Sequence, residues 1–454
     1  MLSAFANSVR IPELRQRIFF TAAMLFLCRL LAVVPIPGVN AQALQMAVEQ
    51  MRHLSGGSMG LLFDMFSGGA VRNFAVGALG VLPYISASII LQLMTAVVPT
   101  LERLAREGDS GRQKIIQYTR YLTVLLCLIQ GFAMAKAAEH PEAFGINFPL
   151  VQNPSFGFLA IAVLSMTTGT MLLMWLGEQI TERGIGNGMS LIISAGIVSS
   201  LPSAVRALVE KFHPVDGVAQ FNIFHLVFLL GMLALVISTV TAVTQAQRKI
   251  PVQYAKRVIG RKQYGGQSTY MPLRVNYSGV MPIIFSQAIL MFPNRIFMTI
   301  ATSLNQPTGV WAWLASITQY GTGFYTLLDA IMILFFSYFW VATQFNPIQI
   351  ADDLKKYGGY VPGIRPGKPT AEFLDRTMTR ITLVGAIFLA FIAVMPTVVA
   401  TKLGIPWIVA QFFGGTSLLI TVGVMLDTMR QVESHLVMRY YDGFLTKGRL
   451  RGRR

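Results

Sequence analysis

Cysteine and charge are both scarce in this sequence. Only two cysteines, Cys28 and Cys127, occur in 454 residues, and both lie inside apolar stretches. Two thiols in such places exclude a disulfide framework and a cysteine-based metal site. Charged residues make up 13% of the chain and hydrophobic residues 54%. This balance excludes an ordinary soluble domain, whose surface needs far more charge.

Catalytic motifs are also absent. The sequence contains no GxxxxGK[ST] phosphate loop, no HExxH metal motif, no GxSxG elbow and no pair of carboxylates within its apolar segments. Its five histidines are scattered over loops and segment ends. We therefore expect that the protein is not an enzyme and that it holds no metal and no cofactor.

What the chain has instead is a series of ten long apolar segments. Each is close to the ~20 residues that a helix needs to cross the hydrocarbon core of a bilayer. The sequence therefore predicts an all-α polytopic membrane protein with ten transmembrane helices. The predicted spans are 18–38, 79–98, 119–137, 155–176, 189–207, 222–245, 279–300, 326–345, 381–400 and 407–426.

Positive charge is distributed unevenly between the two sides of these spans. Most of the 37 lysine and arginine residues fall at the start of the chain, in every second loop and in the tail. The positive-inside rule then places both termini in the cytoplasm. A net charge of +17 is also typical of proteins that bind nucleic acid. Here the basic residues are dispersed over loops on one side and are not concentrated in a soluble domain, so we do not expect nucleic acid as the direct ligand. The opposite side has only Arg52, Lys136, Arg206, Lys211, Arg295 and Lys402.

The outside loop after the fifth span divides the chain into two halves of five spans. Because five is odd, the second half begins on the opposite face, so any similarity between the halves is an inverted repeat. Two cytoplasmic loops are longer than simple turns. They either serve only to set the topology or protrude so that a partner can bind them, and their aromatic and glycine content favours partner binding. The predicted parts are a cytoplasmic amphipathic segment at 1–17, an N-terminal half at 18–210, a C-terminal half at 220–430 with loops at 246–276 and 346–377, and a basic cytoplasmic tail at 431–454.

An apolar stretch at about 60–74 is too short and too interrupted to cross the membrane. The run Ser67-Gly68-Gly69 breaks it, and Asp64 and Arg72 flank the break. Irregular backbone at membrane depth is tolerated only where protein or a water-filled cavity surrounds it. We therefore predict a re-entrant segment that lines a cavity.

Ionisable residues are nearly absent from the predicted spans. Such residues usually mark coupling sites, but here we expect Arg29 to snorkel or to bind a backbone carbonyl, and Asp329 to be structural. Uncharged polar groups are more frequent, and interhelical hydrogen bonds of about 0.6 kcal/mol each account for them. They include Ser86, Ser88, Gln92, Thr95, Thr119, Thr123, Ser286 and Gln287.

The second span resembles a known family. ALGVLPYISASIILQLM, from Ala78, closely resembles the signature of the SecY family, the channel subunits of the Sec protein-translocation complex, or translocon, of the bacterial cytoplasmic membrane. The resemblance continues through SGGA at Ser67, EGDSGRQKIIQYTRY from Glu107, ERGIGNGMS from Glu182, YAKRVIGRKQY from Tyr254, FNPIQIADDLKKYGGYVPGIRPGKPT from Phe345 and FGGTSLLI from Phe413. It covers nearly the whole chain.

The resemblance implies an hourglass channel between two pseudo-symmetric halves. A short plug helix closes it, a ring of apolar side chains narrows it, and a lateral gate between spans two and three and spans seven and eight opens toward lipid. The implied plug residues are Phe63, Asp64, Met65, Phe66, Ser67, Gly68, Gly69 and Arg72. The implied ring is Val81, Ile85, Met189, Ile193, Ile284 and Ile420, and the implied gate residues are Ser86, Gln92, Thr123, Ser286, Gln287 and Phe292.

The family also implies a function and partners. Such a channel passes unfolded secretory proteins and releases transmembrane segments sideways into lipid. Its implied partners are the small subunits SecE and SecG, the SecA ATPase, the ribosome, the unfolded preprotein with its signal sequence, and membrane lipids. Positions that match docking sites are Arg257, Arg261, Lys262 and Arg365. The strongest alternative is an ion-coupled secondary transporter with inverted repeats, which predicts a charged site at mid-membrane.

Overall fold

The structure is a computed structural model, and its description covers most of the chain. The described residues are 11–40, 43–44, 46, 64, 67–139, 149–151, 153–212, 223–254, 257–259, 262–264, 268–303, 309–319, 322–403, 405, 409–410, 412 and 415–447. Three predicted plug residues, Phe63, Met65 and Phe66, lie outside this set, as does Arg261 among the predicted docking residues.

The chain divides into two compact units. The first comprises Met1–Lys211 and Ile420–Arg454, and the second Phe212–Leu419. The first break falls between the predicted halves at 18–210 and 220–430, whereas the second lies inside the predicted C-terminal half. An inverted relationship between the halves stays a prediction.

Helices make up most of both units. Up to the first break they are α2 (Pro12–Leu31), α5 (Leu82–Val97), α6 (Pro99–Arg106), α7 (Asp109–Glu139), α8 (Phe156–Arg183), α9 (Gly188–Ser199) and α10 (Leu201–Phe212). They continue with α11 (Ile223–Gln245), α12 (Met281–Ser303), α13 (Val310–Ile317), α14 (Gly323–Gln344), α15 (Pro347–Lys356), α16 (Lys368–Leu403) and α18 (Thr416–Lys447). The last helix therefore extends far into the predicted tail at 431–454.

Six helices in the described part of the chain are long and apolar enough to cross a membrane, and a bent pair formed by α5 and α6 makes a seventh. They correspond to predicted spans two, three, four, five, six, eight and nine. The helices α2, α12 and α18 overlap predicted spans one, seven and ten. The polytopic helical fold class is confirmed, and the number of ten spans stays a prediction.

Several helix starts follow from local sequence. Proline stands in the first turn of α2, α5, α6 and α15, where its missing N–H costs no hydrogen bond. Asn187 and Asn346 cap α9 and α15 by accepting hydrogen bonds from backbone N–H groups. Between α5 and α6 the chain bends by 103°. Val98, which precedes Pro99, is extended there, because proline disfavours a helical conformation in the residue before it.

The predicted span at 18–38 is wrong over its last seven residues, 32–38. The helix α2 ends at Leu31, and the chain then pairs with a later segment. The N–H groups of Ile36, Val76 and Gly77 donate to the carbonyls of Phe74, Val34 and Leu31 at 3.0, 2.9 and 2.9 Å. The helix cannot continue because Pro35 has no N–H to donate to the Leu31 carbonyl, and the bond from Gly77 pairs that carbonyl instead.

Both long loops contain strands that the sequence analysis did not predict. A three-stranded sheet has the order β4-β1-β5, with β1 (Gln247–Tyr254) antiparallel to β4 (Ser268–Arg274) and to β5 (Gly359–Tyr360). Beyond β1, β2 (Arg257–Ile259) pairs with β3 (Lys262–Tyr264). The signal that was missed is the alternation in β1, where Ile250 and Val252 are buried between exposed neighbours.

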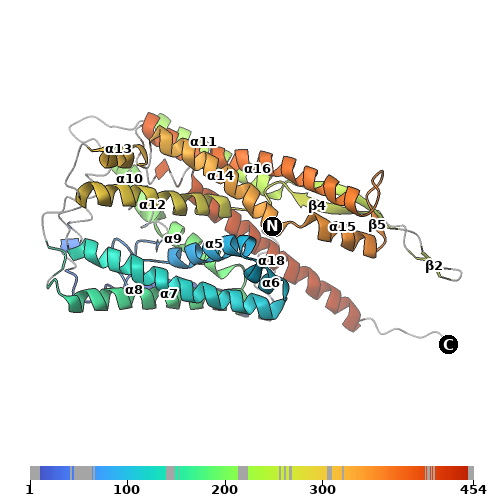
Figure 1. Cartoon of the computed structure of the whole chain (residues 1–454), viewed down its shortest axis with the longest axis horizontal. Coiled ribbons are helices and arrows are strands. Elements are labelled where there is room, and N and C mark those ends of the chain that lie inside the picture. The colour runs from blue at the N-terminus through green and yellow to red at the C-terminus, as the bar shows by residue number, and fades with distance from the viewer. Residues whose placement is uncertain are drawn as a thin grey trace. The chain divides into compact units, whose positions relative to one another are not determined.

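The sheet packs onto the ends of two membrane helices of the second unit. An apolar cluster joins strands β1 and β4 to the C-terminal end of α14 and the N-terminal part of α16, which lie side by side (Figure 1). Its buried members are Ile250, Leu273, Val341, Phe345, Val361, Leu374, Met378 and Ile381. We call β1, β4, β5 and this cluster the sheet lobe.

In the first unit, α7 and α8 run side by side (Figure 1). Arg120 and Glu178 join them through a two-pronged ion pair, with N–O distances of 3.2 and 2.7 Å.

Small residues allow close approach elsewhere in the unit. A Cβ at Gly169 of α8 would collide with the carbonyl oxygen of Val76, so glycine is required at this contact.

Candidate functional site

The interrupted apolar stretch forms an irregular re-entrant segment, which we define as Asp64 with residues 67–80. Gly68 and Gly69 have φ angles of 67° and 89°, a left-handed conformation in which glycine carries no steric penalty. Asp64 closes the turn, because its carboxylate accepts a hydrogen bond from the backbone N–H of Arg72 at 3.0 Å and pairs with the Arg72 guanidinium at 2.8 Å. The stretch is therefore irregular, as expected, and its re-entry into the membrane stays a prediction.

The two ends of the re-entrant segment are held in different ways. From Phe74 onward it is fixed by apolar packing, because Phe74 and Leu79 join a buried cluster with Cys127 and Met166 of α7 and α8. Before Phe74, the contacts among the described residues are polar or involve small side chains such as Ala70. By these described contacts, the earlier part is the less firmly held of the two.

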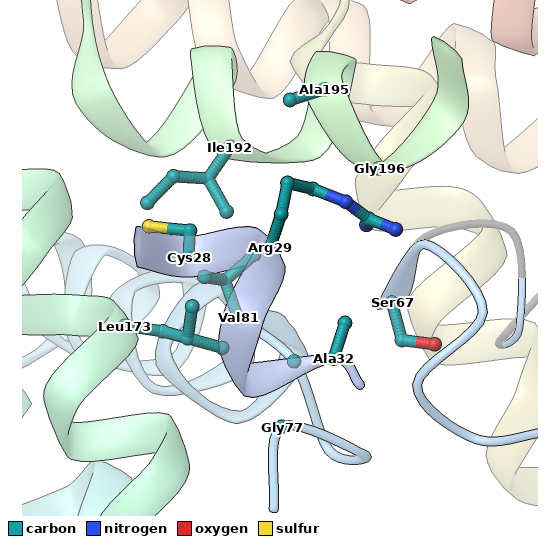
Figure 2. Close-up of a pocket in the computed structure, with 11 residues that line it drawn as sticks. Cys28, Arg29, Ala32, Ser67, Gly77, Val81, Leu173, Ile192, Ala195 and Gly196 are labelled. Atoms are coloured by element: carbon teal, nitrogen blue, oxygen red, sulfur yellow. The ribbon is translucent and has the colours of Figure 1, made fainter. Parts of the chain in front are cut away.

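Arg29 of α2 reaches the earlier part of this segment. Its Nη2 donates a 2.7 Å hydrogen bond to the carbonyl oxygen of Gly68, so of the two predicted roles the structure shows carbonyl binding. Figure 2 shows the Arg29 side chain extending from α2 toward the turn that carries Ser67, with Gly196 of α9 beside it. Ser199 Oγ also lies 3.4 Å from the Gly68 oxygen.

A small cavity of about 20 Å³ borders this contact, enough for one water molecule. Its walls come from α2, the re-entrant segment, α8 and α9 (Figure 2). The lining residues are Cys28, Arg29, Ala32, Ser67, Gly77, Gly80, Val81, Leu173, Ile192, Ala195 and Gly196. This void includes one predicted ring residue, Val81, and the predicted water-filled cavity along the segment stays a prediction.

The predicted ring residues are mostly buried. Val81 precedes α5 and Ile85 lies in its first turn, while Met189 and Ile193 lie one turn apart on α9. Met189 is half-buried, and a Cβ at Gly177 of α8 would lie 2.8 Å from its Sδ, which places the thioether against α8. The exposed fractions are 3% for Val81, 7% for Ile85, 4% for Ile193, 6% for Ile284 and 1% for Ile420. Convergence of all six side chains at one level stays a prediction.

The predicted gate residues make hydrogen bonds inside their own units. In the second unit, Ser286 Oγ of α12 donates to the Asp329 carboxylate of α14 at 2.5 Å, and both residues are buried. Gln287 Nε2 lies 3.4 Å from Thr416 Oγ1. The Ser286–Asp329 bond ties α12 to α14, which agrees with the structural role expected for Asp329.

In the first unit, the gate residues bond within their own helices. Gln92 Nε2 of α5 lies 3.4 Å from Ser88 Oγ, and Thr123 Oγ1 of α7 donates to the carbonyl of Thr119 at 2.7 Å. Ser86 is half-buried on α5. The side chain of Phe292 lies outside the described part of the structure. A role of all six residues in one gate stays a prediction.

Comparison with known proteins identifies the family. The SecY family model matches residues 75–429. The chain belongs to the SecY family. Protein translocase subunit SecY of Escherichia coli K12 is 46% identical over 445 residues, covering 97% of this chain and 96% of that protein. The corresponding subunit of Chlamydia muridarum is 44% identical over 455 residues, covering 98% of each.

Solved structures with the SecY-type fold also match. One, described as "The structure of a protein conducting channel", has a TM-score of 0.59 at 16% identity and covers 93% of this chain and 92% of its own. Another concerns the plug domain of the SecY protein, said to stabilise the closed state of that translocation channel, and has a TM-score of 0.56 at 18% identity with the same coverage. At these identities they support the fold.

The residues predicted to dock partners in this SecY-family chain lie in the two long loops. Arg257 is on β2 and Lys262 on the paired strand β3. Arg365 is exposed in the turn between β5 and α16, and its carbonyl accepts a hydrogen bond from Thr370 at 2.8 Å. In the described part of the chain, no group of three or more His, Cys, Asp or Glu side chains is placed to hold a metal ion.

Proposed function

We propose that this chain is the channel-forming subunit of a protein translocase in the bacterial cytoplasmic membrane. It passes unfolded secretory polypeptides across the bilayer and releases transmembrane segments sideways into lipid. The observation that carries the proposal is the re-entrant segment, held against α2 and beside a small cavity, in a chain that belongs to the SecY family over most of its length.

The predicted ring explains how such a channel carries a polypeptide without binding it. Its six members have aliphatic or thioether side chains, which offer no charge to an ion or a substrate. An apolar constriction excludes water when it is narrow and so opposes ion flow. The same side chains part around a passing chain of any sequence, since none of them makes a specific bond to it.

The rival proposal of an ion-coupled transporter lacks support. The relatives are translocase subunits, and a transporter of this kind needs charged groups around a mid-membrane site. Of the charges considered in the predicted spans, Arg29 donates to a backbone carbonyl and Asp329 accepts from Ser286. Both hydrogen bonds are structural in character.

The lateral gate is the route for apolar segments. A segment that contacts lipid partitions into it with a free energy set by its apolar residues. Polar residues on α5, α7 and α12 make bonds of modest strength, about 0.6 kcal/mol each within membranes. The described bonds of Gln92, Thr123 and Ser286 lie within α5, within α7, and between α12 and α14 on one side of the gate, so bonds of this strength across the closed gate, which break when a signal sequence arrives, are part of the proposal.

Energy for transport comes from partners in this proposal, since the chain has no nucleotide-binding motif. SecA, the ribosome, SecE and SecG are the proposed partners, and one solved relative is Sec61 in a canine ribosome-channel complex. Arg257, Arg261, Lys262 and Arg365 are the proposed docking residues. Both termini lie in the cytoplasm, and the chain itself catalyses no reaction.

A crosslinking experiment tests the channel and its lining. A photoreactive amino acid is placed at positions 85, 193, 284 and 420, and a secretory precursor is arrested during transport by the translocase in membrane vesicles. All four positions should crosslink to the precursor. Matched controls at Phe132 and Phe228, which are 54% and 49% exposed on apolar helices, should crosslink to lipid. Precursor contacts at the controls with none at the four ring positions would exclude the ring.

A further inference from the structure

The contact between Arg29 and Gly68 joins a transmembrane helix to the less firmly held part of the re-entrant segment. The bond is short, at 2.7 Å, and its donor carries a full charge. Charge-assisted hydrogen bonds are about twice as strong as neutral ones, and a half-buried site screens them less than water does. This bond therefore contributes more to the position of the turn than its neutral neighbours do.

Gly68 is also the residue that fits this contact. A Cβ added there would collide with Arg29 Nη1 and lie 2.9 Å from the Cα of Gly196. Its φ of 67° already disfavours other residues. Gly69 has a similar φ of 89°, but a Cβ there meets nothing within 4 Å. The two glycines thus share backbone strain and differ in their contact with Arg29 and α9.

The described residues of the turn are also bonded to one another. Asp64 bonds Arg72 twice, and the Asp64 carbonyl oxygen also accepts from the backbone N–H of Gly69 at 2.7 Å. These contacts lie within the turn and do not involve α2. Among the described hydrogen bonds, those that would break on displacement come from Arg29 of α2, from Ser199 of α9 and from Asn73 to the Ala32 carbonyl, and only the Arg29 bond is charged.

We propose that Arg29 is a positioning residue that latches the re-entrant segment in its resting place by holding the Gly68 carbonyl, and that the segment leaves this place when that hydrogen bond breaks. The latch rests on the proposed function, since it assumes that the segment closes a channel. Apolar packing of Phe74 and Leu79 keeps the far end of the segment attached, so the released turn can return.

The test measures resting ion leak and precursor transport in vesicles that contain the complete translocase. Arg29→Met keeps an unbranched side chain at this position and removes its donors, so leak without a precursor should rise at least about tenfold, the loss expected for one charged hydrogen bond. Arg29→Lys, which retains a charged donor, should give a smaller rise. Unaltered leak in Arg29→Met would overturn the latch.

A glycine pair separates the latch from a general loss of structure. Gly68→Ala leaves Arg29 in the chain and displaces the contact, and should raise leak severalfold more than Gly69→Ala, which adds the same backbone strain. Equal leak in the two variants would overturn the latch even if Arg29→Met fails to fold.

Transport by the unmodified protein distinguishes the two proposals. Suppose that the unmodified protein carries a precursor and crosslinks to it at the ring positions, while the Arg29 variants show the same ion leak as the unmodified protein. The latch alone is then wrong. If the unmodified protein carries no precursor with its partners and ATP present, the proposed function fails and the latch fails with it.

Discussion

The re-entrant segment of the first unit and the sheet lobe of the second are both insertions between membrane spans, but they are stabilised in different ways. The sheet lobe has a regular strand ladder and a cluster of eight buried apolar residues. The first part of the re-entrant segment depends on a few polar contacts from Asp64, Arg72 and Arg29. Apolar burial over a large cluster resists local opening, whereas single hydrogen bonds do not. The sheet lobe should therefore open locally less often than the first part of the re-entrant segment.

Among the variants that test this difference in stabilisation, Leu374→Ala should cause the largest loss of stability, and the loss should fall in the sheet lobe. Leu374 is fully buried in the sheet lobe, and such truncations cost about 2–5 kcal/mol because they leave a cavity. Hydrogen exchange of the amides in β1 and β4 should become faster by the corresponding factor. Val384→Ala on the same helix, where the side chain is 62% exposed, is the control. Equal effects would mean that the lobe is not an apolar core.

Asp64→Asn should have the next largest effect, confined to the re-entrant segment. The Asp64–Arg72 ion pair is largely buried, with side chains 10% and 24% exposed, and its loss should cost about 1–3 kcal/mol. Amide exchange over residues 67–73 should accelerate at least about tenfold, with little change in β1. Asp353→Asn breaks an exposed pair with Lys356 and should leave exchange in both regions as it was.

Asn73→Ala should have a smaller effect on the same segment. The Asn73 amide donates to the Ala32 carbonyl at 3.2 Å, and its exposed position limits the contribution to about 0.5 kcal/mol. A double-mutant cycle with Asp64→Asn, followed by hydrogen exchange, should give additive changes, because one bond lies inside the turn and the other joins it to Ala32, just after α2. Strong coupling would show that the turn does not move as a unit.

Arg365→Glu should change stability least, within about 0.5 kcal/mol, because the side chain is exposed. Transport driven by SecA or the ribosome should nevertheless fall, since Arg365 is a proposed docking residue. Lys355→Glu reverses another charge in the same loop and should reduce transport less. If both variants lose transport equally, the total charge of the loop matters and the position of Arg365 does not.

Much of the fold was predictable because the hydrocarbon core of a bilayer requires long apolar helices, and such segments can be recognised in the sequence. Seven of the ten apolar segments appear as long apolar helices or as the bent pair. The family motifs are continuous runs of residues, so the family can be identified from them without knowing the fold. The end of span one was missed because the span was drawn from hydropathy alone, although Pro35 and Pro37 are a local signal that a helix ends. The pairing of residues 34–36 with residues 74–76 is what no local pattern predicts.

The sequence alone determined that the chain is a helical membrane protein with several spans, where the break at Ser67–Gly69 falls, and that the chain is a SecY-family member, since hydropathy, glycine positions and motifs are local properties. Only the tertiary structure decided that Arg29 holds the Gly68 carbonyl, that Ser286 bonds Asp329, and that two distant loops form one sheet. Each of these joins residues many positions apart. A polar side chain can form hydrogen bonds with many groups of the chain. The packing of the folded backbone decides which of these groups lies close enough to bond.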